Sequence, residues 1–383
     1  MAGIYIHIPF CKQACHYCNF HFSTSMRGTD DMVQAIIKEL EMRKMYLADA
    51  EINTLYFGGG TPSVLSHRQL GDIIAACYKN YNIASELELT LEANPDDLIL
   101  EKTKEIHSLG VNRLSIGVQS FHENDIKWMN RSHNADQAFR SIEHSFSAGI
   151  DNFSIDLIFG SPTTSNEQWL NNLALAHSFG IKHLSCYGLT VEEDTALNHF
   201  IKTKKLKPLD DSLLAEQFKL TMDTLQSYGY DHYEVSNYAL QGYISQHNTN
   251  YWKRIPYLGI GPSAHSYNGT ERSWNIAHNV KYLTEVSNNR LPLTSEKLTD
   301  YDKYNEYIMT GMRTNWGCNI NDIASIGQQF KTHFLSESAS FIIDGSIIRN
   351  GENYILDHKS WVISDAIVSE LFIDTPEVTT VNY

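Results

Sequence analysis

Three cysteines, Cys11, Cys15 and Cys18, lie close together near the start of the chain, directly after a short apolar stretch, Ile4 to Ile8, that is typical of a strand. Spacings of three and two intervening residues let one loop surround a single inorganic centre from three sides. Soft thiolates suit an iron–sulfur cluster or zinc. A cluster of four irons has four ligand positions, so three thiols would leave one iron open to a ligand that is not protein.

A structural zinc site is the alternative, completed by a histidine such as His16 or His21. Zinc sites of this kind usually pair two Cys-x2-Cys knuckles, and the sequence holds no second knuckle. We therefore predict an iron–sulfur cluster at this loop, and a zinc-binding module without enzymatic activity is the less favoured interpretation.

Polar and glycine residues also follow the strand-like stretches later in the chain. Gly58-Gly59-Gly60-Thr61 can bring bare backbone close to a ligand, although a tight turn would use the same residues. The carboxylate of Glu92 could accept two hydrogen bonds from ribose hydroxyls, or could cap a helix at the surface. Taken singly, Gln119, Arg131 and Asp156 fit a structural role better than a functional one.

The composition indicates an ordinary globular protein. Its 383 residues suffice for one large and one smaller domain. A formal net charge of −15 disfavours nucleic acid and anionic membrane surfaces as partners. We expect no signal peptide and no membrane span, because no apolar run approaches about 20 residues. The expected location is the cytoplasm, where the remaining Cys77, Cys186 and Cys318 would be buried thiols rather than disulfides.

The elements that must position these residues alternate regularly over the first two-thirds of the chain. Strands are expected at Gly3–Ile8, Asn53–Phe57, Glu86–Glu92, Asn112–Ile116, Asn152–Phe159 and Lys182–Leu189. Helices are expected at Asp30–Asp49, Ser66–Tyr81 (with Ser66 as N-cap), Leu98–Leu109, Ala135–Ala148, Asn166–Phe179 and Asp211–Tyr228. Repeated βα units build a parallel sheet, either doubly wound or closed like a barrel. We predict a partial barrel, because the cysteine loop would then stand after the first strand, where barrels carry their ligands.

The alternation ends near Tyr230, and the composition from there to Ser266 predicts irregular structure over the open end of the barrel. Farther on, the pattern predicts helices at Leu298–Arg313, within Ile320–Leu335 and at Trp361–Phe372, with a hairpin over Ser340–Ile355. The expected domains are a barrel over 1–235, an irregular capping and connecting region over 236–295, and a small α+β module over 296–383.

The cysteine spacing, with the aromatic Tyr17 just before the last thiol, resembles the radical S-adenosylmethionine superfamily. Tyr5-x-His7-Ile8-Pro9-Phe10-Cys11 resembles the opening of the oxygen-independent coproporphyrinogen III oxidase family, and the likeness runs through nearly the whole chain. It implies a partial (β/α)6 TIM-like barrel of the radical S-adenosylmethionine type, followed by a small α+β C-terminal domain.

This resemblance also implies the cofactors. The three cysteines would hold a [4Fe–4S] cluster whose open iron binds S-adenosylmethionine, and reduction would cleave the sulfonium to a 5′-deoxyadenosyl radical. An electron donor such as flavodoxin or ferredoxin would be a partner. A guanidinium is a fitting partner for the ligand's carboxylate. The implied S-adenosylmethionine-binding residues are Tyr5, Tyr17, Gly59, Gly60, Thr61, Glu92, Gln119, Arg131 and Asp156.

Two features distinguish the branches of this family. The oxidase branch carries a fourth cysteine two residues after the third, where this chain has Phe20. His247-Asn248-x-x-Tyr251-Trp252 resembles a motif of the haem-chaperone (HemW-type) branch. A neutral imidazole is a good axial ligand for haem iron, so the resemblance implies His247 as haem ligand. Packing of His247 between barrel and cap is the alternative.

The resemblance therefore implies a haem chaperone that carries haem, or another porphyrin, and transfers it to an acceptor protein. The alternative is an oxygen-independent coproporphyrinogen III oxidase, which decarboxylates two propionate side chains to give protoporphyrinogen IX. The radical machinery is complete, whereas Phe20 argues against coproporphyrinogen oxidation. A homodimer is the commonest oligomer among soluble proteins, so it is a candidate assembly here, although the sequence does not determine the oligomeric state.

Overall fold

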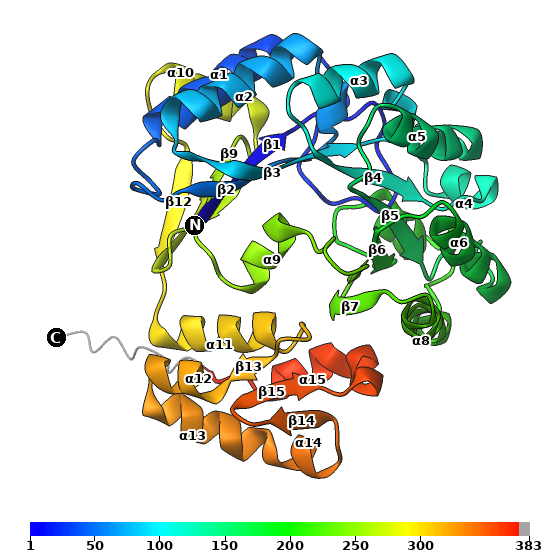
Figure 1. The fold of residues 1–383 in the computed structure, drawn as a ribbon, viewed down its shortest axis with the longest axis vertical. Helices are drawn as coiled ribbons and strands as arrows, with labels where there is room; N and C mark the ends of the chain where they lie inside the picture. Colours follow the sequence, from blue (N-terminus) through cyan, green and yellow to red (C-terminus); the bar gives the residue numbers. More distant parts are fainter. Residues whose placement is uncertain (375–383) are drawn as a thin grey trace. The chain divides into compact units, whose positions relative to one another are not determined.

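The computed structural model describes residues 1–374, which form two compact units (Figure 1). Unit 1 comprises Met1–His232, Ser236–Asn250 and Ile255–Ser295. Unit 2 comprises Tyr233–Val235, Tyr251–Arg254 and the described chain from Glu296 onward. The end of the predicted C-terminal module, 375–383, lies outside the described residues.

Unit 1 is built on six parallel strands that neighbour one another in the order in which they occur in the chain. These strands are β1 (Ala2–Ile8), β2 (Ile52–Gly59), β3 (Ile83–Ala93), β4 (Arg113–Gln119), β5 (Phe153–Phe159) and β6 (His183–Gly188). Parallel neighbours need crossover connections, and helices provide them here. The prediction of a partial barrel of six βα units is confirmed.

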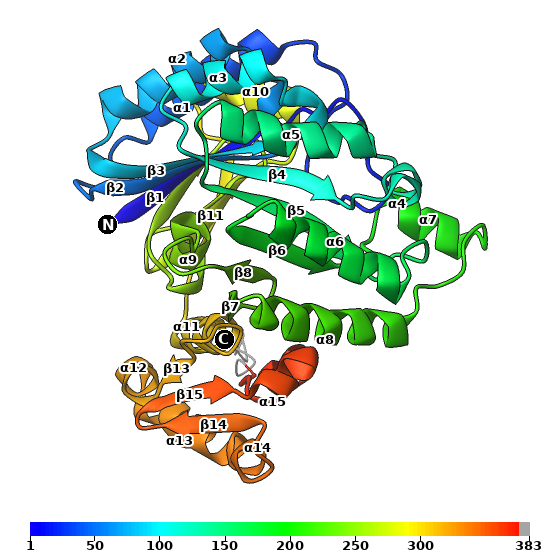
Figure 2. The same cartoon turned by 45° about the vertical axis from the view of Figure 1, so that its right-hand side comes forward.

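The crossover helices lie along the outer face of the curved sheet, as Figures 1 and 2 both show. They are α1 (Thr29–Met42), α2 (His67–Asn80), α3 (Leu100–Ser108), α5 (Ala135–Ser147) and α6 (Asn166–Ser178), and α8 (Asp211–Ser227) packs against α6. The short helices α4 (Glu123–Trp128) and α7 (Ala196–Lys202) follow β4 and β6, and 3-10 turns lie at Pro62–Val64 and Pro95–Asp97. Ser66 caps α2 as predicted, because its hydroxyl accepts the N–H of Gln69 in a capping box. The sequence did not predict the short helices α4 and α7, whose six and seven residues are too few to establish a helical period.

Side chains alternate along the strands between an apolar and a polar face. Ile4, Leu55, Leu91, Leu114 and Leu157 are fully buried and point toward the helices. The residues beside them point to the other, inner face of the sheet: Tyr5, Tyr56, Glu92, Ser115 and Asp156. A parallel sheet is usually apolar on both faces, so the polar inner face marks where a ligand is to be sought.

The prediction of irregular structure after residue 230 is wrong. That stretch contains β7 (Asp231–Glu234), β8 (Asn237–Ala239), α9 (Gln246–Trp252), β9 (Tyr257–Ile260), β10 (His265–Tyr267), β11 (Glu271–Asn275), α10 (Asn279–Ser287) and β12 (Leu293–Lys297). Strand β9 pairs parallel with β1 and β8 pairs antiparallel with β6, so the sheet of unit 1 runs β11-β10-β9-β1-β2-β3-β4-β5-β6-β8. Strands of three to five residues are too short for the alternation of apolar and polar residues to be recognised.

A buried ion pair fastens the added strands to α1. The Glu39 carboxylate, which is fully buried, accepts hydrogen bonds from the Gly261 N–H (2.9 Å), the Asn275 amide (2.7 Å) and the Tyr282 hydroxyl (2.6 Å). Arg43, one turn along α1, lies 3.4 Å from Glu39 Oε1. Because the charge of Glu39 is compensated from several elements, this carboxylate fixes the edge of the sheet beside β1.

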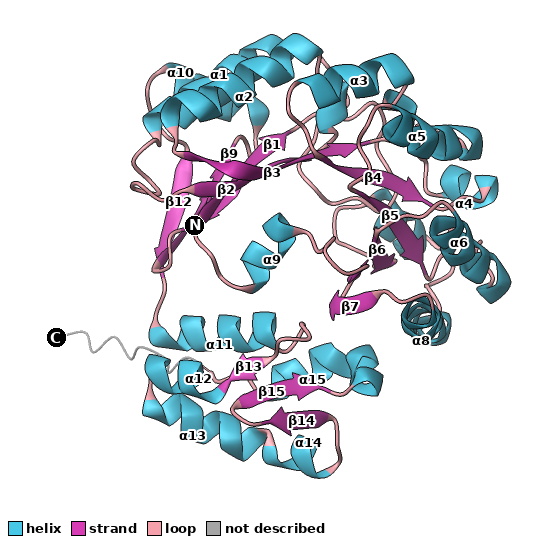
Figure 3. Cartoon of the chain, in the orientation of Figure 1, coloured by secondary structure: helices cyan, strands magenta, loops and turns pink. Residues whose placement is uncertain are grey.

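Unit 2 is a small α+β module, as predicted (Figure 3). Its sheet has the order β13-β15-β14, from β13 (Cys318–Asn319), β14 (Ile347–Asn350) and β15 (Asn353–Leu356). Its helices are α11 (Asp300–Gly311), α12 (Ile320–Ile326), α13 (Gln328–Glu337), α14 (Ala339–Ile343) and α15 (Ser364–Glu370), with a 3-10 helix at His358–Ile363. The hairpin is shorter than predicted, because its first residues form α14. Among the helices of residues 1–374, none is long and apolar enough to cross a membrane.

Candidate functional site

A cavity of about 510 Å³ opens at the carboxyl ends of the parallel strands in unit 1. Its wall includes all three loop cysteines and eight of the nine predicted S-adenosylmethionine-binding residues: Tyr17, Gly59, Gly60, Thr61, Glu92, Gln119, Arg131 and Asp156. Tyr5 and His247 do not line it. Residues from the six parallel strands or from the loops that follow them therefore meet at one place, as expected for the ligand edge of a βα fold.

The cysteine loop is held in place by backbone hydrogen bonds to distant parts of unit 1. The N–H of Cys11 donates to the Ser23 carbonyl (3.0 Å), and the N–H of His16 donates to the Met129 carbonyl (3.1 Å). The His16 carbonyl in turn accepts the N–H of Leu197 (2.7 Å). A loop without regular secondary structure thus presents its half-buried, unbridged thiols to the cavity in a fixed arrangement.

The surroundings of the thiols suit ligands of a cationic iron–sulfur centre. The Thr61 hydroxyl donates to Cys11 Sγ (3.3 Å), and Arg131 Nη1 lies 3.3 Å from Cys15 Sγ. Burial raises the pKa of the Cys11 thiol to about 11 and also raises that of Cys18. A positively charged centre is what would keep such thiols ionised.

Among residues 1–374, no three His, Cys, Asp or Glu side chains converge as the ligands of one metal ion would. The thiolates of a multi-iron cluster bind different irons, so the loop cysteines need not converge on one point. The donor set, three soft thiols with hydrogen-bond donors beside two of them, therefore fits a cluster.

Arg131 places a half-buried positive charge at the wall of the cavity. Its Nη2 donates to Asn94 Oδ1 (2.7 Å) and to the Gly117 carbonyl (3.0 Å), and its Nη1 lies 3.3 Å from the Tyr17 hydroxyl. Its Nε is buried and has no hydrogen-bond partner among the described residues. No carboxylate neutralises this guanidinium in any described ion pair, so a ligand carboxylate is a fitting counter-charge.

The glycine turn at the end of β2 lies closer to the backbone of Phe10 than a side chain at Gly60 would allow. Gly59 has a φ of 105°, and at Gly60 a Cβ atom would lie 2.6 Å from the carbonyl oxygen of Phe10. That oxygen accepts the N–H of Thr61 (2.7 Å). The turn therefore holds the start of the cysteine loop against β2 and also forms part of the cavity wall, so both interpretations drawn from the sequence apply to it.

Two carboxylates with raised pKa values face the cavity from β3 and β5. Burial raises the pKa of Glu92 to about 7, although a hydrogen bond from the Tyr56 hydroxyl to its Oε1 (2.8 Å) acts in the opposite direction. Burial likewise raises the pKa of Asp156 to about 6, and Ser115 Oγ donates to its Oδ1 (3.3 Å). Carboxylates with raised pKa values at the wall of a cavity are suited to accept hydroxyl hydrogen bonds from a ligand.

Gln119 ends β4 in an unusual backbone conformation. Its φ is 65°, and the pairing of β4 with β5 shifts register between Ile116 and Gln119. A non-glycine residue with positive φ is strained and is often found at a functional site. The shift turns the Gln119 side chain toward the cavity, which it lines.

His247 lies in the interior of unit 1, with 2% of its surface exposed. Its Nδ1 is 2.8 Å from Thr54 Oγ1, and its ring stacks on that of Tyr56 with centroids 4.8 Å apart. Burial lowers the pKa of this imidazole to about 3, with a further contribution from the charge of Arg113. The ring is therefore neutral, as an axial ligand must be.

Several residues of the site were missed by the sequence analysis. Gln13, Asn94 and Ser115 line the cavity, and Asn94 carries the shortest contact to Arg131. Asn94 could have been found, because it follows β3 directly in the sequence Asn94-Pro95. Tyr56 and Ser115 lie inside strands, where only their alternation with apolar neighbours points toward the ligand side.

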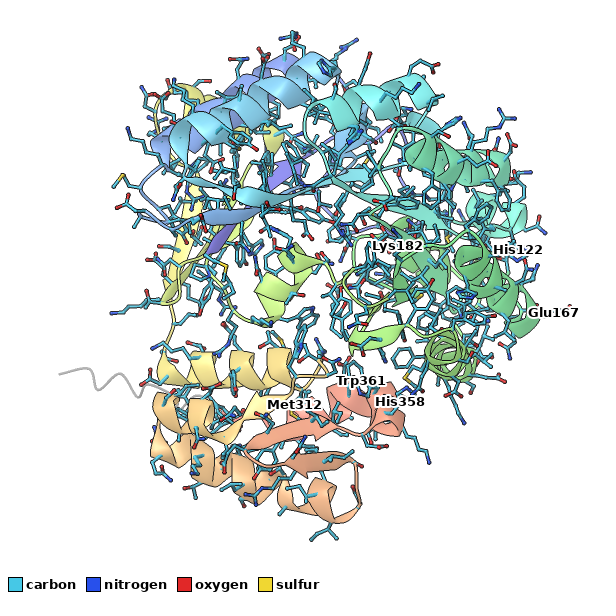
Figure 4. All side chains as sticks on the ribbon, in the orientation of Figure 1. His122, Glu167, Lys182, Met312, His358 and Trp361 are labelled. Atoms are coloured by element: carbon cyan, nitrogen blue, oxygen red, sulfur yellow. The ribbon has the colours of Figure 1, made fainter. Side chains whose placement is uncertain are left out.

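Two further hollows lie on the outer helices of unit 1, and neither is lined by a cysteine. One lies between α1 and α10, and the other is lined by residues that include His122 and Glu167. Figure 4 labels His122 and Glu167 on the outer, helical side of the sheet. Both hollows are therefore apart from the cysteine cavity.

The sequence of this chain is similar to those of known proteins of one superfamily. A model of the Radical SAM superfamily matches residues 5–176, a range that includes every predicted site residue except His247. A protein of Escherichia coli (strain K12) named heme chaperone HemW is 38% identical over 266 residues, which cover 69% of each chain. A protein of Synechocystis with the same name is 32% identical over 352 residues, covering 88% of this chain and 84% of its own.

One solved structure is similar over nearly the whole length. It is described as coproporphyrinogen III oxidase (HemN) from Escherichia coli, a radical SAM enzyme. The TM-score is 0.83 at 20% identity, and the alignment covers 97% of this chain and 89% of that one. At this level of identity the likeness establishes the fold alone.

Proposed function

The chain belongs to the HemW family within the radical S-adenosylmethionine superfamily, and on that basis we propose that it is a haem chaperone, which binds haem and transfers it to acceptor proteins. The observation that carries this proposal is the 32% identity to a protein named heme chaperone over 88% of the chain. Phe20 supports it, because the chain lacks a thiol at the position where the oxidase branch carries its fourth cysteine.

Membership of the superfamily implies a [4Fe–4S] cluster and S-adenosylmethionine, which together supply reductive radical chemistry when bound. In our proposal Cys11, Cys15 and Cys18 hold the cluster. Arg131 faces the carboxylate of S-adenosylmethionine, and Glu92 accepts its ribose hydroxyls. The remaining proposed contacts come from Tyr5, Tyr17, Gly59, Gly60, Thr61, Gln119 and Asp156.

The proposed haem ligand is His247. Its neutral imidazole and its aromatic neighbours, Tyr5 and Tyr56, suit an iron porphyrin. Because its ring is 2% exposed, coordination of haem by this residue requires the first turn of α9 to move away from β2 and β3. The buried position thus makes haem binding dependent on a conformational change.

A coproporphyrinogen III oxidase is the second candidate, favoured by the similarity of fold to the enzyme from Escherichia coli. Its reaction requires the same cavity, and the two candidates differ in what the protein does with its porphyrin. We rank it below the chaperone because of Phe20, which is 68% exposed and lines the cavity beside the loop cysteines.

The partners follow from the same proposal. A chaperone of this kind requires a haem-acceptor protein, and reduction of its cluster requires a donor such as flavodoxin or ferredoxin. We further propose a cytoplasmic location and a homodimer. The charge of −15 supports a protein partner rather than nucleic acid.

Haem titration of the anaerobically reconstituted protein tests the proposal. The parent is expected to bind haem and to pass it to an added apo-haemoprotein such as apomyoglobin. His247→Ala is expected to lose the histidine-ligated haem spectrum, whereas His67→Ala, at an exposed position on α2, is expected to keep it. A parent protein that binds no haem would refute the chaperone function, and a His247→Ala variant with the parental spectrum would refute His247 as ligand.

A further inference from the structure

His247 is in direct contact with residues that reach the S-adenosylmethionine cavity. The rings of Tyr5, Tyr56 and His247 form a triangle, in which the Tyr5 and His247 centroids are 6.4 Å apart. The Tyr56 centroid lies 6.0 Å from that of Tyr5 and 4.8 Å from that of His247. Interplanar angles of 24° and 21° make both contacts close to parallel. Tyr56 belongs neither to the predicted cofactor residues nor to the cavity wall.

The far end of the Tyr56 side chain reaches the site. Its hydroxyl donates to Glu92 Oε1 at 2.8 Å, and Glu92 lines the cavity from the neighbouring strand. Gly58 makes this approach possible, because a Cβ there would lie 3.0 Å from both Glu92 Oε1 and Tyr56 Cε1, and 2.9 Å from Tyr5 Cε2. A larger residue at this position would displace the hydrogen-bonded pair.

Hydrogen bonds also fix the position of His247 beside Tyr56. His247 Nδ1 lies 2.8 Å from Thr54 Oγ1, two residues before Tyr56 on the same face of β2. The backbone N–H groups of Gln246 and His247 donate to the buried Glu88 carboxylate at 3.0 and 2.9 Å. Glu88 and Glu92 share one face of β3, so this strand holds His247 with one carboxylate and faces the cavity with the other.

We propose that Tyr56 is a positioning residue of the S-adenosylmethionine site, which orients the Glu92 carboxylate toward the ribose through its hydroxyl while its ring rests on His247. This inference depends on the proposed function only in taking Glu92 as the ribose-binding group. It adds a structural connection between the cofactor cavity and the residue proposed for haem.

The test is the affinity of the reconstituted protein for S-adenosylmethionine, measured by equilibrium dialysis without added reductant. Tyr56→Phe keeps the stacked ring and removes the hydroxyl, and the expected loss of affinity is about tenfold, as for a hydrogen bond to a charged group. Tyr282→Phe is the matched control, because its buried hydroxyl also donates to a carboxylate, Glu39 (2.6 Å), but lies outside the cavity. It is expected to bind S-adenosylmethionine as the parent does.

Two further measurements separate positioning from general damage. In a Glu92→Gln background, adding Tyr56→Phe is expected to cause little further loss, because the hydroxyl acts through Glu92. In the single variant, the midpoint of affinity against pH is expected to move upward, since Glu92 loses a donor that favours its ionised form. The titratable groups that face Glu92 are Tyr5, Tyr56, Asp156 and Cys18, and only Tyr56 changes.

A Tyr56→Phe variant with parental affinity and pH midpoint would overturn the proposal, as would an equal loss in Tyr282→Phe or full additivity with Glu92→Gln. Haem titration of the same Tyr56→Phe sample is expected to match the parent, because the ring beside His247 is retained. If the parent binds S-adenosylmethionine but no haem, the chaperone function fails while the role of Tyr56 is still decided by the first measurement.

Discussion

Glu92 is the proposed ribose-binding residue, and burial disfavours its ionised form. Its folded-state pKa of about 7 lies above the ordinary value of 4.5, because burial disfavours the charged form. An acid with a raised pKa binds its proton more tightly in the folded state. Its favourable contribution to stability is therefore present at low pH and is lost as pH rises from about 4.5 through about 7.

Glu92→Gln should therefore stabilise the protein while weakening cofactor binding. At pH 8, without S-adenosylmethionine, we expect the free energy of unfolding in urea to rise by about 1–3 kcal/mol, and at pH 5 we expect almost no difference. Affinity for S-adenosylmethionine should fall at least about tenfold. If Glu92→Gln were equally destabilised at pH 5 and pH 8, the claim that burial raises the pKa of Glu92 would be contradicted.

In the proposed assignment the three loop thiols hold one cluster together, so the loss of one thiol should remove it. Cys15→Ser replaces a soft ligand that lies beside Arg131, and we expect iron and sulfide, measured after anaerobic reconstitution, to fall to background. Cys77→Ala, a buried thiol on α2, is the control and should keep both. Retention of a full complement of iron and sulfide in Cys15→Ser would refute the cluster assignment.

At the scale of elements, the first turn of α9, which belongs to unit 1, must move if His247 binds haem. Its first two N–H groups are fixed by Glu88, which is 6% exposed, and its imidazole is fixed by Thr54. A carboxylate at a helix N-terminus satisfies donors that have no partner within the helix and complements the helix dipole. These contacts hold the first turn of α9 against the inner face of the sheet.

Weakening this contact should make α9 open more readily. In Glu88→Gln we expect amide hydrogen exchange over 246–252 to become roughly tenfold faster, and haem association to become faster as well. Glu86→Gln changes an exposed carboxylate on the same strand and should alter neither rate. Unchanged exchange, or slower haem association, would contradict the proposal that opening of α9 precedes haem binding.

The edge of the sheet beside β1 depends on the buried Glu39 network. Glu39→Gln leaves the guanidinium of Arg43 without its ionic partner, and we expect a loss of about 3–5 kcal/mol in the free energy of unfolding in urea. Glu41→Gln, an exposed change two residues along α1, should cost little. A small effect of Glu39→Gln would mean that β9, β10 and β11 are held chiefly by their backbone pairing.

For the whole molecule, the sequence was informative where a pattern repeats over many residues. Six strands and six long helices were expected because strands such as β5 are mostly apolar and helices such as α2 carry a capping signal. The cysteine loop and most cofactor residues stand at strand ends, so they could be placed together before the structure was known. The resemblance to a family supplied their roles.

What could not be predicted depends on contacts between distant segments. The positive φ of Gln119 follows from a register shift between β4 and β5, which no local pattern reveals. The stack of Tyr56 and His247 joins residues far apart in the chain. Strand β9 has four residues and is recognisable only through its pairing with β1. In each case tertiary structure, rather than local propensity, decides the outcome.

The whole molecule is proposed to use a radical S-adenosylmethionine fold to handle haem rather than to oxidise a porphyrinogen. The most direct test is anaerobic incubation of the reconstituted protein with coproporphyrinogen III, S-adenosylmethionine and a reductant, with haem titrated into a parallel sample. We predict that coproporphyrinogen III is recovered unchanged while the parallel sample binds haem. Formation of protoporphyrinogen IX, with carbon dioxide released, would contradict the account and identify the protein as an oxidase.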